Sequence, residues 1–227
     1  MRFTAVIFGI DDPFGLSLCR VMLESGGTVF GGTALTTAPA IAELKVEFPD
    51  SFRAVAMNPQ SGDSLKSASS EIGAIDVDLL VSNVDSAVYD KEDAISGFDT
   101  MKRTYDIDAL GPIRFVEAFL PLMSAGMKRL CFVTSEKGSL GMTAAKSAAA
   151  SGSPLLPLAE FAYSMSKTAL NRSVMIMFNN LRRDGFSFRL LVPKAGNAAV
   201  ACGYFLKDRD DEFRLAIADD EGNEWPY

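Results

Sequence analysis

Short apolar runs alternate with longer amphipathic segments along most of this 227-residue chain. Each run is apolar at successive positions, which is typical of a strand buried on both faces of a parallel sheet. We expect strands at 4–9, 28–32, 53–57, 77–82, 129–134 and 187–192. We expect helices at 14–25, 39–48, 62–72, 98–123 and 160–183. The alternation predicts one α/β domain over 1–227, a doubly wound parallel sheet with helices on both faces.

Polar or turn-forming residues follow several of the expected strands. Gly9, Asn83 and Ser135 stand at or just after three of them, and Pro193-Lys194 follows a fourth. Ligands of doubly wound sheets bind outside the carboxyl ends of the strands. These positions are therefore predicted to surround one site.

The composition excludes several classes of function. The chain has no histidine, which excludes Ser-His-Asp triads, Cys-His pairs and imidazole metal ligands. We therefore expect no metal site, and chemistry falls to carboxylates, Lys, Tyr, Ser and Cys. A net charge of −7 argues against nucleic acid or an anionic membrane as partner, because phosphate contacts need clustered Lys and Arg.

The cysteines and the apolar runs indicate a cytoplasmic location. Cys19, Cys131 and Cys202 are odd in number, widely spaced and set in apolar surroundings, so we expect buried, reduced thiols. No apolar stretch reaches the roughly 20 residues of a membrane span. The opening apolar run ends at Asp11-Asp12, and we expect this run to be too short for a secretion signal.

One pair of residues suggests proton transfer without histidine. Tyr163 and Lys167 are four apart in an expected helix, so they lie on one face. The ammonium can stabilise the phenolate and lower the tyrosine pKa from about 10. Ser135 ends the apolar run before this helix. The alternative is a surface Tyr and Lys on an ordinary amphipathic helix.

The Tyr-x-x-x-Lys pattern, an upstream Ser and a Gly-containing turn after the first strand resemble the short-chain dehydrogenase/reductase family, whose fold is Rossmann-like. The resemblance implies that Tyr163 exchanges a proton with a small carbonyl or alcohol substrate. It implies that Ser135 binds the substrate oxygen and that Lys167 tunes the tyrosine and holds the nicotinamide ribose. The implied cofactor is NAD or NADP.

A fourth catalytic position departs from the family. Asp108 stands where the family carries an Asn. An amide donates and accepts hydrogen bonds, whereas an ionised carboxylate only accepts, so the usual water relay from Lys167 would have to be rebuilt. Asp108 can still accept from Lys167 or from a water.

The phosphate loop departs further. Gly9 and Gly15 retain two glycines of the family's motif, and Phe14 between them is expected beside the cofactor, but Pro13 replaces the middle glycine and removes an N–H donor. Asp11 and Asp12 add negative charge beside an anion site. The alternative is that these residues cap the following helix, because Asp is favoured at the N-cap and Pro at the first helical position.

The remaining cofactor contacts that the resemblance implies are Thr33, Asn58, Asn83 and Pro193. Thr33-Ala34 follows the second strand, where an acid would select NAD and a basic residue NADP. Asp85 occupies a close-packed glycine position. Together with the altered loop, these departures predict weak binding of either dinucleotide.

Three further segments carry expectations. The end of the chain, 218–226, loosely resembles that of C-factor and sniffer-type carbonyl reductases; alternatively it is a plain tail whose Trp225 plugs the edge of the domain. The Ala-, Ser- and Gly-rich segment 142–157 is either a solvated loop or a flap over the pocket.

Family members pair the helices equivalent to 98–123 and 160–183, which implies a homodimer or homotetramer; alternatively their apolar residues pack on the protein's own sheet. These residues are Ile113, Phe115, Val116, Phe119, Leu170, Val174, Met175, Met177 and Phe178.

Two functions from different classes follow. The first is an NAD(P)-dependent oxidoreductase that reduces a small carbonyl or oxidises the alcohol through Ser135, Tyr163 and Lys167. The alternative is a cofactor-independent or catalytically silent relative with an assembly or regulatory role. The retained catalytic residues favour the first, and the altered phosphate loop favours the second.

Overall fold

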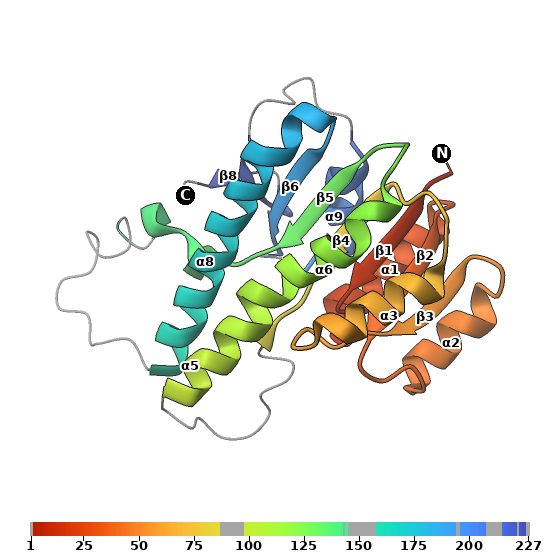
Figure 1. Cartoon of the computed structure of the whole chain (residues 1–227), viewed down its shortest axis with the longest axis horizontal. Coiled ribbons are helices and arrows are strands. Elements are labelled where there is room, and N and C mark those ends of the chain that lie inside the picture. Colours follow the sequence, from red (N-terminus) through yellow and green to blue (C-terminus); the bar gives the residue numbers. More distant parts are fainter. Residues whose placement is uncertain are drawn as a thin grey trace.

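A single eight-stranded sheet forms the centre of the molecule (Figure 1). The computed structural model describes residues 2–86, 98–142, 144, 158–193, 196–207, 215–221 and 223–225. The strand order is β3-β2-β1-β4-β5-β6-β7-β8, and only the β7–β8 pair is antiparallel. The strands are β1 Thr4–Phe8, β2 Thr28–Thr33, β3 Phe52–Ala56, β4 Leu79–Ser82, β5 Arg129–Val133, β6 Ser187–Val192, β7 Ile217–Asp219 and β8 Glu224–Trp225. The predicted Rossmann-like, doubly wound fold is confirmed.

Helices cover both faces of the sheet (Figure 1). One layer holds α3 Gly62–Ile72, α5 Phe98–Tyr105, α6 Gly111–Phe119 and α8 Leu158–Leu181. The other holds α1 Pro13–Glu24, α2 Pro39–Glu47 and α9 Ala198–Leu206. Side chains alternate along β1, so Val6 and Phe8 enter the first core while Ala5 and Ile7 enter the second. This alternation explains why the strand reads as continuously apolar.

The long helix expected at 98–123 is divided. A π-helical segment, η1 Asp106–Leu110, joins α5 to α6, and a 3-10 turn, η2 Leu120–Leu122, follows α6. The Gly111 N–H donates to the Asp106 carbonyl, a bond between residues five apart. Pro112 has no N–H with which to bond the carbonyl four residues earlier, so an unbroken α-helical ladder is lost here. The sequence pattern showed the helical period but missed this insertion.

Other helix boundaries agree closely with expectation, and the C-terminal elements were missed. The expected helix at 160–183 begins at Leu158 and ends in a 3-10 turn, η4 Arg182–Asp184, before Gly185 with φ of 82°. Helix α9 and strands β7 and β8 were not expected. A second 3-10 turn, η3 Glu136–Gly138, follows β5.

The C-terminal strand closes one edge of the sheet. Trp225 in β8 donates from Nε1 to Asp219 Oδ2 at 3.0 Å and packs beside the first core. This contact fits the plain-tail alternative, in which Trp225 plugs the edge. Residues 222 and 226 lie outside the described residues, so the likeness to the C-factor and sniffer-type ending stays a prediction. The segment 142–157 also lies outside them, apart from Met142 and Ala144.

The three cysteines are buried and unpaired, as expected. Within the described ranges, no helix is both long enough and apolar enough to cross a membrane.

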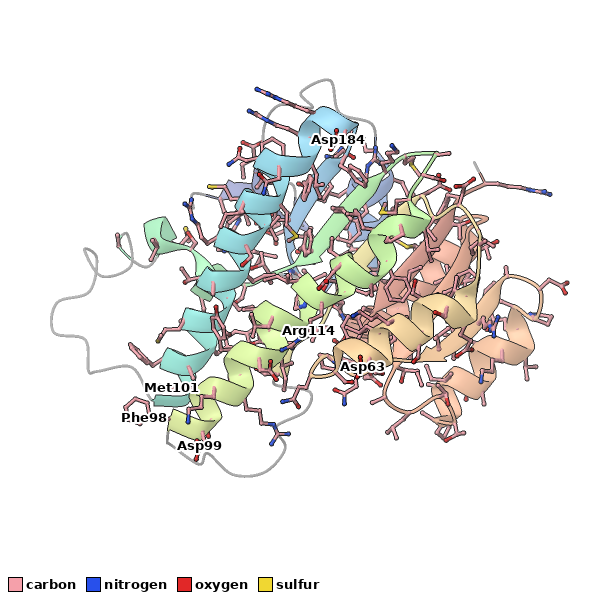
Figure 2. The ribbon with its side chains drawn as sticks, in the orientation of Figure 1. Asp63, Phe98, Asp99, Met101, Arg114 and Asp184 are labelled. Carbon is pink, nitrogen blue, oxygen red and sulfur yellow. The ribbon has the colours of Figure 1, made fainter. Side chains whose placement is uncertain are left out.

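The apolar residues of the two long helices are mostly internal. Six of those that the sequence offered as interface residues are buried in the first core: Phe115, Val116, Phe119, Leu170, Val174 and Phe178. The exposed apolar side chains on these helices are different ones: Phe98, Tyr105, Phe161, Met165 and Ile176. Figure 2 shows Phe98 at the outer end of α5.

Candidate active site

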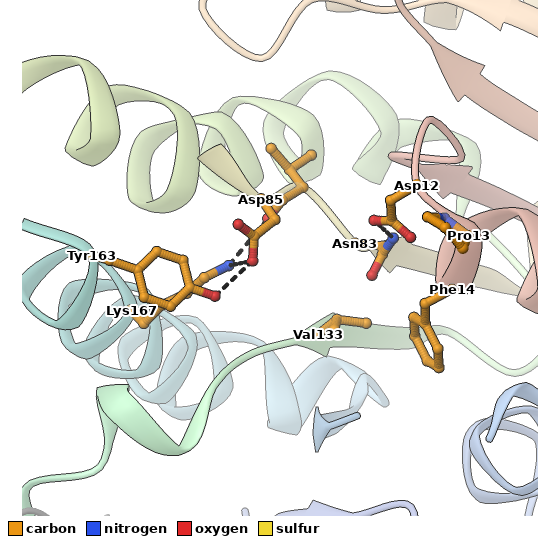
Figure 3. Close-up of a pocket in the computed structure, with 9 residues that line it drawn as sticks. Asp12, Pro13, Phe14, Asn83, Asp85, Val133, Tyr163 and Lys167 are labelled. Atoms are coloured by element: carbon orange, nitrogen blue, oxygen red, sulfur yellow. Dashed lines mark hydrogen bonds and ion pairs between the residues drawn. The ribbon is translucent and has the colours of Figure 1, made fainter. Parts of the chain in front are cut away.

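A pocket of about 430 Å³ lies at the carboxyl ends of the central strands (Figure 3). Its lining residues follow β1 and β4, end β5, or come from α1 and α8: Asp12, Pro13, Phe14, Asn83, Val84, Asp85, Val133, Tyr163 and Lys167. The strand ends expected to converge therefore do so at Asn83 and beside Ser135. Val84 and Val133 were not anticipated, because apolar lining residues carry no chemical signature in the sequence.

Tyr163 and Lys167 share one face of α8, as their spacing predicted. Lys167 Nζ lies 5.3 Å from the centroid of the Tyr163 ring and donates to the Val84 carbonyl at 3.2 Å. The lysine is 1% exposed, whereas the tyrosine is half-buried. The aliphatic part of Lys167 is thus held by the core, and its ammonium faces the pocket.

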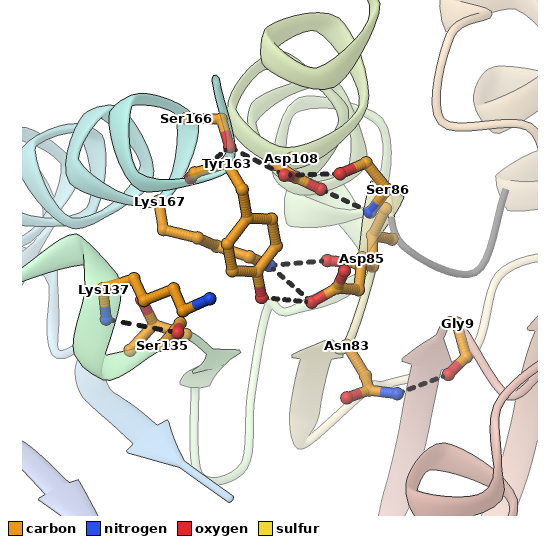
Figure 4. Close-up of polar contacts among 12 residues, drawn as sticks. Gly9, Asn83, Asp85, Ser86, Asp108, Ser135, Lys137, Tyr163, Ser166 and Lys167 are labelled. Carbon is orange, nitrogen blue, oxygen red and sulfur yellow. Dashed lines mark hydrogen bonds and ion pairs between the residues drawn. The ribbon is translucent and has the colours of Figure 1, made fainter. Parts of the chain in front are cut away.

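Asp85 contacts both groups (Figure 4). The Tyr163 hydroxyl donates to Asp85 Oδ2 at 2.6 Å, and Lys167 Nζ lies 3.3 Å from the same oxygen. Burial and the Asp85 carboxylate raise the pKa of Tyr163 far above its ordinary value. The expected lowering of this pKa by Lys167 is therefore wrong for the described arrangement, because desolvation and a neighbouring anion outweigh the ammonium.

Ser135 joins the same cluster. It caps η3, and its Oγ accepts from the Lys137 N–H at 3.2 Å. A hydrogen bond between the Ser135 and Tyr163 side chains partly opposes the rise in the tyrosine pKa. Lys137 Nζ lies 6.0 Å from the Tyr163 ring centroid, on the side of Ser135. The fold therefore brings Ser135, Tyr163 and Lys167 together.

Asp108 lies behind the cluster in the π-helical segment and is fully buried. Its Oδ1 accepts from the Ser86 N–H at 2.6 Å, and its Oδ2 accepts from the hydroxyls of Ser86 and Ser166 at 2.9 and 2.7 Å. Burial raises the pKa of Asp108, and the charge of Lys167 opposes that rise. The hydrogen bonds to this carboxylate thus come from two serines that the sequence did not single out, although Ser166 lies inside the Tyr-x-x-x-Lys motif.

The two loop aspartates point in different directions. Asp12 is the N-cap of α1: its Oδ1 accepts from the Gly15 N–H at 2.7 Å, and its Oδ2 accepts from Asn83 Nδ2 at 2.9 Å. Pro13 is at the first helical position. The capping alternative is therefore correct for Asp12. Asp11 turns instead to the end of β2, where its Oδ1 accepts from Thr33 Oγ1 at 2.5 Å.

The two retained glycines are explained by packing within the protein. Gly9 has φ of 96°, and a Cβ there would lie 2.7 Å from the Asn83 carbonyl oxygen. A Cβ on Gly15 would lie 2.1 Å from the Gly9 carbonyl oxygen. The Asn83 side chain donates to that same oxygen at 2.7 Å. The loop is thus pinned against the end of β4.

The remaining predicted cofactor contacts are dispersed. Phe14 and Asn83 line the pocket, whereas Thr33, Asn58 and Pro193 lie beyond its lining residues. Asn58 belongs to an exposed turn after β3, where its Oδ1 accepts from the Gln60 N–H at 2.9 Å. Pro193 directly follows β6 and is partly buried.

Residues 3–201 match a protein-family model described as short chain dehydrogenase. C-signal of Myxococcus xanthus is 40% identical over 94 residues, covering 41% of this chain and 49%, or about half, of C-signal. The 1-hydroxy-2-glutathionyl-2-methyl-3-butene dehydrogenase of Rhodococcus sp. (strain AD45) is 28% identical over 195 residues, covering 84% of this chain and 76% of that enzyme.

Solved structures share the fold. A carbonyl reductase from Pseudomonas aeruginosa superposes with a TM-score of 0.76 at 19% identity, covering 99% of this chain and 100% of that one. An NADPH-bound carbonyl reductase from chicken fatty liver gives a TM-score of 0.76 at 17% identity, covering 99% and 94% of the two chains. At such identities the likeness establishes the architecture alone.

Proposed function

We propose, because the chain belongs to the short-chain dehydrogenase family, that it is an NAD(P)H-dependent reductase of a small carbonyl compound. One observation carries the proposal: Tyr163, Lys167 and Ser135 meet at one end of a pocket whose other end is the N-terminus of α1. The pocket volume of about 430 Å³ lies at the small end of the range for ligand sites and suits a small substrate.

The catalytic cluster is placed for proton transfer to a carbonyl oxygen. Tyr163 is the proton donor of this proposal, and the contact with Asp85, which raises the pKa of the phenol and so weakens it as an acid, has to be released first. The Ser135 hydroxyl can hold that oxygen beside the phenol. Once the proton has moved, the Lys167 ammonium, 5.3 Å from the ring, stabilises the phenolate.

A dinucleotide would supply the hydride, and the chain's polar groups fit it better at its two ends than at its centre. Lys167 at one end and the Asp11 carboxylate, which Thr33 and the Ala34 N–H hold, at the other are placed to meet its sugars. At the centre, the Gly15 N–H of the α1 N-terminus is already taken by the Asp12 carboxylate, and Pro13 offers no donor. We therefore propose weak binding of NADH or NADPH.

Asp85 makes the described arrangement a resting state in this proposal. Its carboxylate holds both Tyr163 and Lys167, so it must leave the tyrosine before a substrate oxygen can take its place. The Asp85 side chain is 27% exposed, which gives it a path towards solvent. Its contacts equally favour the second candidate function, a silent relative whose pocket serves binding, because they withhold the proton of Tyr163.

Calorimetric titration with NADH and NADPH separates the two candidates. We expect weak, saturable binding to the wild type and tighter binding to Asp85→Ala, because one carboxylate leaves the site. Asp184→Asn is the matched control, since Asp184 is an exposed aspartate just before β6 (Figure 2). It therefore lies at the amino end of that strand, whereas the pocket lies at the carboxyl ends of the strands. If neither dinucleotide binds to wild type or to a folded Asp85→Ala protein, the reductase proposal is wrong and the silent-relative proposal replaces it.

We also propose that the protein works as a homodimer in the cytoplasm. The exposed apolar residues of α5 and α8, Phe98 at 80% and Met165 at 51% among them, support pairing of these helices between two copies. The three buried, unpaired thiols support a reducing compartment. Light scattering that finds only monomer-sized particles at micromolar concentration would contradict the dimer.

A further inference from the structure

The carboxylate of Asp11 lies at the end of β2, although no acid directly follows β2 in the sequence. Its Oδ1 accepts from Thr33 Oγ1 at 2.5 Å and from the Ala34 N–H at 3.1 Å, and its Oδ2 lies 3.4 Å from the same N–H. Thr33 is 1% exposed, so its hydroxyl is fixed in place. The Thr33 hydroxyl and the Ala34 N–H are thus both directed at Asp11.

The register of the sheet explains how a residue from the first loop reaches the second strand. Strands β1 and β2 pair in parallel, with Phe8 opposite Gly32. The N–H groups of Gly9 and Ile10 both donate to the Gly32 carbonyl, at 3.0 and 3.1 Å. The loop therefore leaves β1 alongside β2, and its next residue is Asp11.

We propose that Asp11 makes the site select NADH over NADPH, an inference that rests on the proposed function. A carboxylate accepts hydrogen bonds from the two vicinal hydroxyls of an adenosine ribose. A 2′-phosphate instead carries negative charge and needs donors. Among the described residues at this strand end, the Thr33 hydroxyl and the Ala34 N–H already donate to Asp11, and the Leu35 N–H donates to Thr33 Oγ1 at 3.0 Å.

The size of the discrimination follows from the charges. Two like charges about 5 Å apart at an effective dielectric near 20 weaken binding by roughly two orders of magnitude, and solvent screening reduces this. We therefore expect NADH to bind about 30-fold tighter than NADPH. One basic residue contacts the loop after β2 within the described part of the chain: the Lys45 ammonium donates to the Thr36 carbonyl at 3.2 Å. Its exposed position makes it a weak counterweight to Asp11.

Two pairs of probes test the inference by calorimetry. The first pair is NADH and NADPH. The second is adenosine 5′-monophosphate and adenosine 2′,5′-bisphosphate, which differ only in the 2′-phosphate and are too short to reach Asp85. For each pair, the ratio of the dissociation constant of the 2′-phosphorylated probe to that of its partner measures the discrimination. In Asp11→Ser we expect both ratios to approach 1, mainly because the 2′-phosphorylated probe binds more tightly. Asp11→Asn, which keeps an oxygen acceptor for Thr33 and Ala34, guards against a folding defect and should shift the ratios in the same direction.

The controls keep this inference separate from the proposed function. Asp184→Asn and Lys45→Gln should leave the wild-type ratios within about twofold, since neither change touches Asp11. Tighter NADPH than NADH binding in the wild type, or ratios that do not change in either Asp11 variant, would overturn the inference while leaving the reductase proposal standing. If no probe binds to the wild type, to the Asp11 variants or to Asp85→Ala, the proposed function fails and this inference fails with it.

Discussion

Asp12 and Asp85 line the same pocket from opposite ends, yet their partners differ in kind. Asp12 accepts from the Gly15 N–H and from Asn83, so its charge caps a helix and fixes a loop. Asp85 accepts from the Tyr163 hydroxyl and lies beside the Lys167 ammonium, the two groups that would perform chemistry. Both aspartates depart from the family motif in a similar way. One departure is explained by folding, and the other has consequences for function.

A charge in a cofactor site therefore has to be judged by what it contacts. A carboxylate that already satisfies the backbone keeps its position when a ligand arrives, whereas one held by catalytic side chains competes directly with that ligand. Variants of the residues around the pocket test this division.

Replacing Tyr163 by Phe should lower the turnover of a carbonyl substrate by roughly 10²-fold or more, because the proton donor is lost. Stopped-flow or steady-state NADH oxidation measures this. Tyr204→Phe in α9, on the other face of the sheet, is the matched control and should retain activity. Full activity in a folded Tyr163→Phe protein would assign the chemistry to another part of the pocket.

Replacing Asp85 by Ala should raise dinucleotide affinity by about tenfold to a hundredfold, because a negative charge leaves the site. It should also lower the pKa of Tyr163, since the Asp85 carboxylate helps to raise it. The ultraviolet titration of tyrosinate reports that pKa, with Asp85→Ala/Tyr163→Phe as the reference. Asp12→Asn, at the other end of the pocket, should leave the tyrosine titration unchanged. An equal shift in both variants would remove the distinction between the two aspartates.

Replacing Asp108 by Asn should raise turnover by a few-fold, because an amide can both donate and accept in a proton relay behind Lys167. The Ser86 and Ser166 hydroxyls that now donate to the carboxylate can accept from the amide instead. Asp106→Asn is the comparison, since Asp106 pairs with Arg114 on the partly exposed side of the same segment. A lower rate in Asp108→Asn would mean that the carboxylate itself is needed.

Replacing Asp12 by Ala should cost about 1 kcal/mol of folding stability, the usual value of an N-cap, whereas Asn should retain most of it. Burial raises the pKa of Asp12 above its unfolded value of 3.8. Its contribution to stability is therefore complete below pH 3.8 and decreases as pH rises through the higher folded value. Urea denaturation across that pH range should show this decrease in the free energy of unfolding of the wild type. In Asp12→Asn, which has no carboxylate at this position, this decrease should be absent. A stability unaffected by Asp12→Ala would contradict the capping role.

Local patterns predicted much of this molecule. The strands buried on both faces carry their own signature, and the spacing of Tyr163 and Lys167 alone puts them on one helix face. The contact between Asp85 and Tyr163 joins residues 78 apart in sequence, so it depends on how the loop after β4 leaves the sheet. The direction of Asp11 likewise depends on the pairing of β1 with β2. The short strands β7 and β8 have too few residues to show a period.

The π-helical segment η1 has a geometric consequence that links the interior to the surface. A π-turn holds one residue more than an α-turn, and one residue corresponds to about 100° of rotation about the helix axis. The extra residue therefore sets the rotational phase of α5 relative to α6. Deleting one residue from Asp106–Leu110 would turn Asp108 away from Ser86 and Ser166, whose groups donate to its carboxylate, and rotate α5 about its own axis. The orientation of a buried acid and the choice of which side of α5 faces outward are thus fixed by a single inserted residue.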